Sequence, residues 1–413
     1  MILRARAILP VSRPPIENGV IVISENRIRA VGPWPDLQPH ATGEIRDLGE
    51  VILLPGLVNA HCHLDYTDMA GQLPPPPTFT DWIPLIIAAK AAWDFSEYAR
   101  SWLNGAQMLL RTGTTTVGDI EAVPDLLPEL WDTTPLRVFS FLEMTGIRAR
   151  RNSQEILREG VERIDSLSHP RCSASLSPHA PYSTQPELLR LSAGIAREKN
   201  WRITTHVAES EQEFEMFMRA RGKMFDWLQR NERDNSDCGL GSPVAHLARN
   251  DSLGENLLAV HVNLLAPGDI ELLAGNHVHV VHCPRSHDYF RHPPFPRRQL
   301  ADAGINLCLA TDSLSTVRKN GKEKLELNLF EEMRQFAAAD QTVPPFEILR
   351  MATVNGAKAL GRAGQIGELS ENALADLIAI PFAGKNADIY DAVLHHASTV
   401  SASMIDGKWA IAP

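Results

Sequence analysis

The stretch VILLPGLVNAHCHLDYT, residues 51–67, places two histidines directly after an apolar run. The run has the length and composition of a buried strand, and in an extended chain residues two apart point to the same face. His61 and His63 therefore share a face, which is the arrangement of a pair of metal ligands. Surface His-x-His pairs also arise by chance, so the pair alone does not establish a metal site.

The composition is that of a globular protein that acts on small molecules. Of the 413 residues, 44% are hydrophobic and 22% are charged, and the formal net charge is -10. A negative chain disfavours nucleic acid and anionic membranes, so we expect a small-molecule substrate as its partner. No stretch has the ~18 apolar residues of a membrane span, and the start lacks the apolar core of a secretory signal. We therefore expect a cytoplasmic protein, with a homodimer as one alternative for its assembly.

The cysteines indicate neither a disulfide framework nor a structural zinc cluster. They are five in number, scattered along the chain, and contain no C-x-x-C pair. We expect them to be buried thiols.

Both ends of the chain have the pattern of β-structure. Residues 19–32 give two β-rich runs around a turn, and residues 375–380 and 399–412 give further short strands. The two ends together are expected to form one small β-sandwich domain, built from residues 1–54 and 365–413.

Between the ends, eight short apolar runs alternate with longer segments of helical period. The runs are residues 53–63, 114–120, 137–146, 172–180, 202–210, 257–263, 278–286 and 305–313. This alternation predicts an α/β fold with βα units around a parallel sheet, and eight is the strand number of a (β/α)8 TIM barrel, here over residues 55–364. Helices are expected, among others, at residues 96–113, 153–167, 212–230 and 324–339.

Polar residues gather at the carboxyl ends of these runs, where a barrel of this kind builds its active site. They are His61, His63, His179, His206, Glu209, His261, His282 and Asp312. A single histidine at a strand end is more often packed or bonded to solvent than bound to metal. Together, however, these residues converge on one mouth of the predicted barrel. For His282 and the adjacent Cys283, packing near the site is the favoured interpretation.

The residue types at this mouth match a catalytic metal site. Such a site takes three or four nitrogen or oxygen ligands and leaves a position open for water. His61, His63, His206 and Asp312 would supply three imidazole nitrogens and one carboxylate. Coordination lowers the pKa of water from 15.7 towards about 7, which makes a nucleophile at neutral pH. Glu209 is suitably placed to carry a proton, and His261 to orient the water.

The motifs PGLVNAHCHLDYT, SPHAPYS, THVAES, AVHVN, HCPRS and ATDSLS, in this order, resemble the amidohydrolase superfamily, in its branch of nucleobase and nucleoside deaminases and chlorohydrolases. The resemblance implies a distorted barrel, a β-sandwich from both termini, and one divalent metal ion, with zinc expected and iron as the alternative. It assigns metal binding to His61, His63, His206 and Asp312, and proton transfer to Glu209 and His261. Asp312 would also accept a proton from the water.

The fourth apolar run, at residues 172–180, indicates how many metal ions the site would hold. Relatives with two metals bridge them with a carboxylated lysine on the fourth strand, and the run RCSASLSPHAPYS contains no lysine. A site with one metal favours attack on an aromatic C–NH2 carbon, with ammonia leaving after Glu209 has protonated a ring nitrogen. The resemblance thus implies hydrolytic deamination of an adenine-type nucleoside.

Three residues are candidates for substrate contacts. The resemblance places His179 against the sugar and Trp82 against the purine, although a tryptophan is also often part of a core. Arg148, in the segment GIRARR with Arg150 and Arg151, would suit a substrate carboxylate, and a solvated basic loop is the alternative.

The segments GIRARR and HCPRSHDYF together resemble aminodeoxyfutalosine deaminases of menaquinone biosynthesis, whose substrate joins an adenine nucleoside to a benzoate. In the second segment, His287 stands where the branch usually has asparagine. The finer substrate prediction is therefore 6-amino-6-deoxyfutalosine.

Other functions share the same ligands. An S-adenosylhomocysteine/methylthioadenosine deaminase, a guanine deaminase or a chlorohydrolase of this family would use every metal residue named above. An alternative of another class is a non-catalytic metal-binding scaffold, which would need neither Glu209 nor His261.

Overall fold

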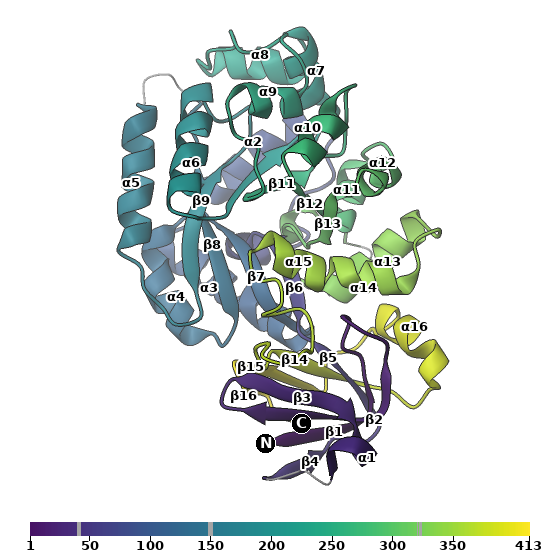
Figure 1. Cartoon of the computed structure of the whole chain (residues 1–413). Coiled ribbons are helices and arrows are strands. Elements are labelled where there is room, and N and C mark those ends of the chain that lie inside the picture. Colours follow the sequence, from purple (N-terminus) through teal and green to yellow (C-terminus); the bar gives the residue numbers. More distant parts are fainter. Residues whose placement is uncertain (39–42, 148–151, 320, 322–323) are drawn as a thin grey trace.

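The barrel sheet holds eight parallel strands in the order of the sequence (Figure 1). We describe residues 1–38, 43–147, 152–319, 321 and 324–413 of a computed structural model. The strands are β6 (Leu57–Cys62), β7 (Thr114–Glu121), β8 (Arg137–Met144), β9 (Ser173–Pro178), β10 (Ile203–Val207), β11 (Leu257–His261), β12 (His279–His282) and β13 (Asn306–Leu309). A parallel bridge between Cys62 and Asp312 brings the chain after β13 back to β6. The predicted TIM barrel is confirmed.

Helices cover the outside of the barrel because one face of each is apolar. The longest, α3 (Phe95–Arg111), begins at a capping box made by Asp94 and Glu97 and buries Trp102 and Leu109. The other helices of the barrel region are α2 (Phe79–Ala91), α4 (Leu127–Thr133), α5 (Ser153–Asp165), α6 (Pro186–Glu198), α7 (Glu211–Arg219), α8 (Lys223–Arg230), α9 (Pro243–Arg249), α10 (Asp269–Gly275), α11 (Pro284–Phe290), α12 (Arg297–Asp302), α13 (Leu329–Ala339), α14 (Pro345–Met351) and α15 (Val354–Ala359). Short 3-10 turns are η2 (Leu64–Met69), η3 (Pro124–Leu126) and η4 (Leu314–Thr316).

The two ends of the chain build a second sheet below the barrel (Figure 1). Its order is β16-β15-β14-β5-β1-β2-β3, and β4 pairs with β1. The strands are β1 (Ile2–Ile8), β2 (Ile16–Ser24), β3 (Arg27–Pro33), β4 (Ile45–Asp47), β5 (Val51–Pro55), β14 (Leu377–Pro381), β15 (Ala402–Ile405) and β16 (Lys408–Ile411), accompanied by α1 (Trp34–Leu37), η5 (Asn386–Asp388) and α16 (Ile389–Leu394). The domain bounds at 54/55 and 364/365 stay a prediction.

A buried ion pair joins the two sheets. Arg137, the first residue of β8, donates from Nε to the Asp376 carboxylate just before β14, over 3.1 Å. Both side chains are buried, so the pair needs its bidentate geometry to compensate for lost hydration.

Two predicted helices differ from the structure. The segment 212–230 forms two helices, α7 and α8, because Ala220 and Gly222 between them adopt positive φ angles of 48° and 102°. The helix expected at residues 324–339 begins only at Leu329, where the Asn328 side chain accepts from the backbone N–H of Phe330 and caps it.

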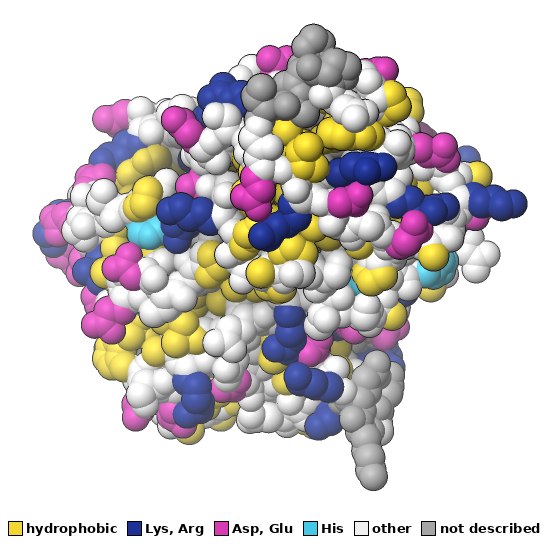
Figure 2. Space-filling model, turned by 90° about the horizontal axis from the view of Figure 1, so that it is seen from below, with side chains coloured by type: hydrophobic (Ala, Val, Ile, Leu, Met, Phe, Trp, Pro, Cys, Tyr) yellow, Lys and Arg dark blue, Asp and Glu magenta, His cyan; other side chains and the backbone are white. Residues whose placement is uncertain are grey.

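The structure also bears on the cysteines, on membrane-spanning helices and on the distribution of surface charge. All five cysteines are free and buried, as expected. Within the described residues, no helix combines the length and apolar content that crossing a membrane requires. On the face shown in Figure 2, Lys and Arg side chains are interspersed with Asp and Glu, so neither sign of charge forms a continuous patch there.

Candidate active site

Four of the predicted ligands meet at the carboxyl ends of the barrel strands. His61 lies in β6, His63 directly follows it, His206 lies in β10, and Asp312 follows β13. The Nε2 atoms of His61 and His206 are 3.3 Å apart. Asp312 Oδ1 lies 3.6 Å from the Nε2 atoms of both His61 and His63. The three histidines form the one group among the described residues whose ligand atoms could hold a metal ion.

Backbone contacts aim these side chains at one another. Asp312 N–H donates to the His61 carbonyl over 3.2 Å, and His63 N–H donates to the Asp312 carbonyl over 3.3 Å. The Thr316 hydroxyl donates to Asp312 Oδ2 over 3.2 Å. His206 Nδ1 lies 2.8 Å from the carbonyl of His179, so its Nε2 faces the cluster. Asp312 also has a φ of 52°, in the left-handed region that non-glycine residues rarely adopt.

The spacing of the nitrogens fits one divalent ion. Two imidazole nitrogens, each about 2.1 Å from a zinc ion at a tetrahedral angle, lie about 3.4 Å apart. The separation of His61 and His206 is 3.3 Å. A neutral imidazole that donates through Nδ1 has a bare lone pair at Nε2, as His206 has here.

Burial sets the charges that metal binding requires. Desolvation lowers the pKa of His63 to about 3 and lowers the pKa of His206 as well, so both rings are neutral near pH 7, which is the form that binds metal. Burial alone would raise the pKa of Asp312, but its hydrogen bond to His61 and the surrounding imidazoles hold that pKa below its usual range. The centre thus offers neutral nitrogens and one carboxylate.

Glu209 and His261 lie beside this centre. Glu209 follows β10, His261 ends β11, and Glu209 Oε1 lies 3.5 Å from His261 Nε2. Burial, with the nearby charge of Asp312, raises the pKa of Glu209. Burial lowers the pKa of His261 to about 3. The pair therefore offers, at one position, a carboxyl that holds its proton more firmly than usual and a neutral imidazole.

A cavity of about 170 Å³ opens in front of these residues. One wall is apolar and consists of Phe79, Trp82, Ile83, Ile86, Ile87, Ile147, Tyr182 and Trp227. The remaining lining is polar and includes His63, His206, Glu209, His261 and Asp312. A flat, apolar ring with a polar edge matches this combination of walls.

The predicted substrate contacts have different positions. Trp82 lines the cavity but also packs on Phe79 and Phe290, with ring centroids 6.0 and 5.5 Å away, so it belongs both to the wall and to an aromatic cluster. His179 lines the cavity, and its Nδ1 lies 2.6 Å from the Ser183 hydroxyl. Arg148, with Arg150 and Arg151, falls outside the described residues. His282 stacks on Phe295 with centroids 3.8 Å apart, in line with the packing interpretation.

Sequence reasoning missed two charged residues in this cavity, Glu143 and Lys90. Glu143 lies in β8, with its carboxylate 3.7 Å from His179 Nε2 and 3.8 Å from Lys90 Nζ. Burial raises the pKa of Glu143, but Lys90 and His179 lower it further than that, so the carboxylate is ionised. A polar residue near the carboxyl end of the third predicted strand was a usable signal for Glu143. Lys90, in the last turn of α2, carried none.

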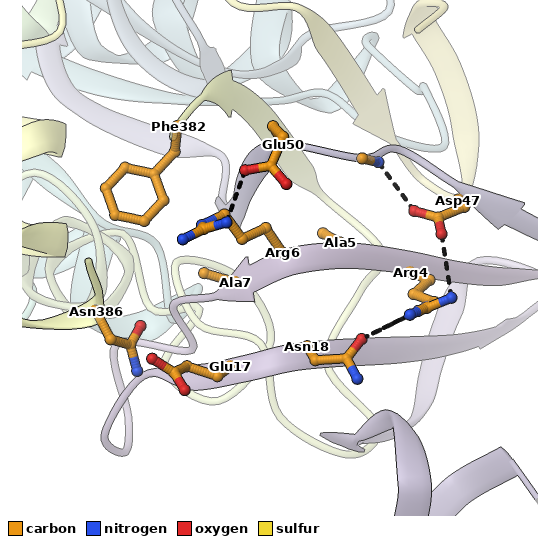
Figure 3. A pocket seen from close by; sticks show the side chains of 11 residues that line it. Arg4, Ala5, Arg6, Ala7, Glu17, Asn18, Asp47, Glu50, Phe382 and Asn386 are labelled. Carbon is orange, nitrogen blue, oxygen red and sulfur yellow. Dashed lines mark hydrogen bonds and ion pairs between the residues drawn. The ribbon is translucent and has the colours of Figure 1, made fainter. Parts of the chain in front are cut away.

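A larger cavity, of about 390 Å³, lies on the terminal sheet. Four of its charged side chains pair with each other, Arg4 with Asp47 and Arg6 with Glu50 (Figure 3). The lining contains no histidine or cysteine, so it lacks the groups that the barrel cavity brings together.

Comparison with known proteins places this centre in a family. A relative from Syntrophobacter fumaroxidans (strain DSM 10017 / MPOB), named 5-methylthioadenosine/S-adenosylhomocysteine deaminase, is 30% identical over 408 residues, covering 91% of this chain and 87% of the relative. An adenosine deaminase from Xanthomonas campestris, solved with bound zinc, has a TM-score of 0.85 at 23% identity and covers 99% of this chain and 92% of its own. The aminofutalosine deaminase of Helicobacter pylori, solved with methylthio-coformycin, has a TM-score of 0.86 at 22% identity and covers 99% and 100%.

The two solved structures share the fold of this chain. The sequence profile of the amidohydrolase family matches residues 52–410, a span that includes every residue of the centre described above. The chain therefore belongs to the amidohydrolase family.

Proposed function

We propose that this amidohydrolase is a metal-dependent hydrolytic deaminase of an adenine nucleoside. The observation that carries the proposal is the placement of Glu209, with its raised pKa, in one cavity with the histidine cluster and an apolar wall. The 30% identity to a deaminase of adenine nucleosides supports the same class of substrate.

His61, His63, His206 and Asp312 would hold one zinc or iron ion. When bound, such an ion lowers the pKa of a coordinated water towards about 7 and so supplies hydroxide at neutral pH. Neutral imidazoles and one carboxylate suit either metal, so the donor set does not select between them.

Glu209 and Asp312 would move the protons of the reaction. The protonated carboxyl of Glu209 donates to the purine ring nitrogen next to the C–NH2 carbon, which makes that carbon electrophilic. Water adds oxygen to the carbon, and Asp312 accepts the proton that the water loses. Asp312 passes this proton to the amino group, the C–N bond breaks, and ammonia leaves. The added hydroxyl group then returns its proton to Glu209 and becomes the ring carbonyl. Consumption of one water and release of one ammonia balance the step.

Glu143 would bind the sugar. With the amino carbon held at the histidine cluster, the polar groups left over in the cavity face the rest of the nucleoside, and Glu143 is an ionised acceptor among them. The two oxygens of one carboxylate can accept both hydroxyl hydrogens of a ribose diol, as acidic residues do in dinucleotide-binding folds. No hydrogen bond from a described residue occupies either oxygen of Glu143, since Lys90 and His179 lie beyond hydrogen-bond distance.

The finer substrate depends on the 5′ group. The segment resemblances and the aromatic wall of Phe79, Trp82 and Tyr182 favour the aryl group of 6-amino-6-deoxyfutalosine, and hence a role in menaquinone biosynthesis. The Syntrophobacter relative favours a methylthio or homocysteine group instead. An apolar wall accepts the aryl ring or the methylthio group, so we propose an adenine nucleoside whose 5′ substituent carries an aryl ring or a thioether.

An ammonia-release screen tests the proposal. The zinc-loaded and iron-loaded proteins are offered adenosine, 5′-methylthioadenosine, S-adenosylhomocysteine and 6-amino-6-deoxyfutalosine, with guanine and cytosine as controls. We expect ammonia from adenine nucleosides and a higher kcat/KM for 5′ groups that carry an aryl ring or a thioether than for the 5′ hydroxyl of adenosine. A 6-chloropurine riboside, which releases chloride, detects the chlorohydrolase alternative. A fully loaded protein that turns over none of these compounds would instead support the non-catalytic scaffold.

A further inference from the structure

The chain makes a sharp turn directly before Glu209, the proposed proton carrier. Strand β10 ends at Val207, Ala208 adopts a left-handed φ of 51°, and α7 begins after Ser210. A non-glycine residue rarely adopts this conformation, so the surrounding structure has to hold it there. The contacts around Ala208 and Glu209 identify what does so.

Glu213 holds the two N–H groups of this turn. Its side chain is fully buried, Oε1 accepts from Ala208 N–H over 3.1 Å, and Oε2 accepts from Glu209 N–H over 2.8 Å. Burial raises the pKa of Glu213 to about 7, and the backbone hydrogen bonds oppose that rise. Each carboxylate oxygen of Glu213 thus accepts a hydrogen bond from one of the two residues, Ala208 and Glu209.

Asn263 holds the two carbonyl groups of the same turn. Its side-chain Nδ2 donates to the Glu209 carbonyl over 2.9 Å, and its backbone N–H donates to the Ala208 carbonyl over 3.0 Å. All four backbone polar groups of Ala208 and Glu209 are therefore fixed by two residues, one from α7 and one from the segment after β11. His287 Nδ1 in turn lies 3.1 Å from Asn263 Oδ1.

Ordinary helix capping does not explain the placement of Glu213. Ser210 caps α7 and accepts from Glu213 N–H over 3.2 Å, which is half of a capping box. In a complete box the glutamate reaches back to the N–H of the cap residue itself, as Glu97 does to Asp94 over 2.9 Å in α3. Glu213 reaches past Ser210 to the two residues before it. Its carboxylate serves the turn rather than the helix end.

We propose that Glu213 and Asn263 are positioning residues that hold Glu209 at the angle needed for proton transfer. The inference rests on the proposed function, because it assumes that Glu209 carries the proton. A misplacement of about 1 Å in a reacting group lowers the rate about 100-fold, which is the scale of effect that this clamp would prevent. A glutamine at position 213 would turn an NH2 group towards one of the two backbone N–H donors and release that half of the turn.

A double-mutant cycle tests the clamp. We expect Glu213→Gln to lower kcat about 100-fold, with KM within about twofold and an unchanged metal content. If Glu213 acts through Glu209, the same substitution in a Glu209→Gln background changes the remaining rate by less than about twofold. The matched control is Glu97→Gln in the ordinary capping box of α3, which should leave kcat unchanged.

A second measurement, amide hydrogen exchange, tests whether the turn at Ala208 and Glu209 is held in place, and it does not depend on catalytic activity. In the metal-loaded Glu213→Gln protein, the amide hydrogens of residues 207–212 should exchange faster than in the parent, and those of α3 should not. If Glu213→Gln does not fold or does not bind metal, Asn263→Ala removes the hydrogen bond from the other side of the turn. The same double-mutant cycle with Glu209→Gln is then measured for Asn263→Ala.

Two outcomes would overturn the inference: equal losses of rate in the parent and in the Glu209→Gln background, or an unchanged kcat with unchanged exchange. Failure of the proposed function shows itself earlier, because the parent protein would then release no ammonia from any adenine nucleoside.

Discussion

At the scale of single residues, the reactivity of this centre comes from burial. Glu209 is 6% exposed and Asp312 is 5% exposed, yet their pKa values move in opposite directions. Desolvation dominates at Glu209, whereas the hydrogen bond from His61 and the neighbouring imidazoles outweigh it at Asp312. In the proposed reaction, this difference would make Glu209 the proton donor and Asp312 the proton acceptor.

Glu209→Gln tests this division. The amide keeps the size of the side chain but cannot donate a proton to a ring nitrogen, so we expect kcat to fall by about 100-fold or more. Metal content and the unfolding temperature should stay at parental values, because Glu209 is not among the proposed ligands. Unchanged turnover at full metal loading would contradict the role of Glu209.

Glu143→Gln tests sugar recognition. We expect kcat/KM for adenosine to fall by about 10-fold or more, because one of the two acceptors for the ribose diol becomes a donor. 2′,3′-Dideoxyadenosine, which lacks the diol, serves as the internal control, and its kcat/KM should change far less. Equal losses on both nucleosides would show that Glu143 acts elsewhere than at the sugar.

Glu121 gives a prediction for pH. Burial, with Asp119 nearby, raises the pKa of Glu121 from 4.5 to about 8. A carboxyl with a raised pKa in the folded state contributes stability that is present below the unfolded pKa and is lost as pH rises through the folded pKa. The free energy of unfolding of Glu121→Gln, minus that of the parent, should therefore increase between about pH 4.5 and about pH 8.

Urea unfolding at several pH values across this range measures that difference. Exposed Glu129→Gln in α4 supplies the baseline for removing one carboxylate from the surface. A difference that stays flat over the range would show that burial does not shift the titration of Glu121.

At the scale of elements, the sequence predicted the strands better than the helices. The barrel strands are buried on both faces, so each appears as a continuous apolar run, and the polar residue at its end marks the mouth. The break between α7 and α8 depends on the left-handed conformation of Ala220, a residue with high helix propensity, so composition predicted a continuous helix there. Lys90 reaches the cavity from a helix outside the strands, a placement that strand-end reasoning does not cover.

The contact between α3 and η2 gives a prediction at this scale. Gly105 of α3 faces η2 so closely that an added Cβ would lie 2.3 Å from the Thr67 hydroxyl. Gly105→Ala should therefore push the helix away and lower the free energy of unfolding by about 1–3 kcal/mol. Because η2 directly follows His63, metal affinity should fall as well.

Gly194→Ala in α6 is the matched control. An added Cβ there meets no atom within 4 Å, so alanine should raise the free energy of unfolding by about 0.5–1 kcal/mol through its better helix propensity. Chemical denaturation of both variants compares them. A Gly105→Ala protein as stable as Gly194→Ala would contradict the close packing of α3 on η2.

At the scale of the whole molecule, the metal should tie activity to stability. The proposed ligands come from β6, β10 and the segment after β13, so one ion would join strands from both ends of the barrel sheet. Binding to the folded state alone stabilises it by about 4 kcal/mol when the free ion is at 1,000 times its Kd.

Chelation should therefore lower the unfolding temperature and abolish ammonia release, and zinc or iron(II) should restore both. Calorimetry and the ammonia assay follow the two effects in one preparation. A chelated protein that keeps full activity would exclude the proposed ion.

The sequence predicted the general architecture of the molecule, but it did not predict the contact that joins the two sheets. Eight apolar runs and two β-rich ends indicated a barrel and a terminal β-domain. The buried pair of Arg137 and Asp376, which joins the two sheets, was not visible in the sequence, because its residues are 239 positions apart and follow no periodic pattern.

The five buried thiols can be used as probes of local unfolding. All five are buried in the folded chain, so an alkylating reagent should modify a cysteine mainly when its surroundings open. Cys62, Cys283 and Cys308 lie within or directly beside barrel strands, whereas Cys238 belongs to the same buried cluster as Met216 of α7 and Met224 of α8. The mass increments acquired in a labelling time course would therefore reveal whether that cluster opens before the barrel itself comes apart.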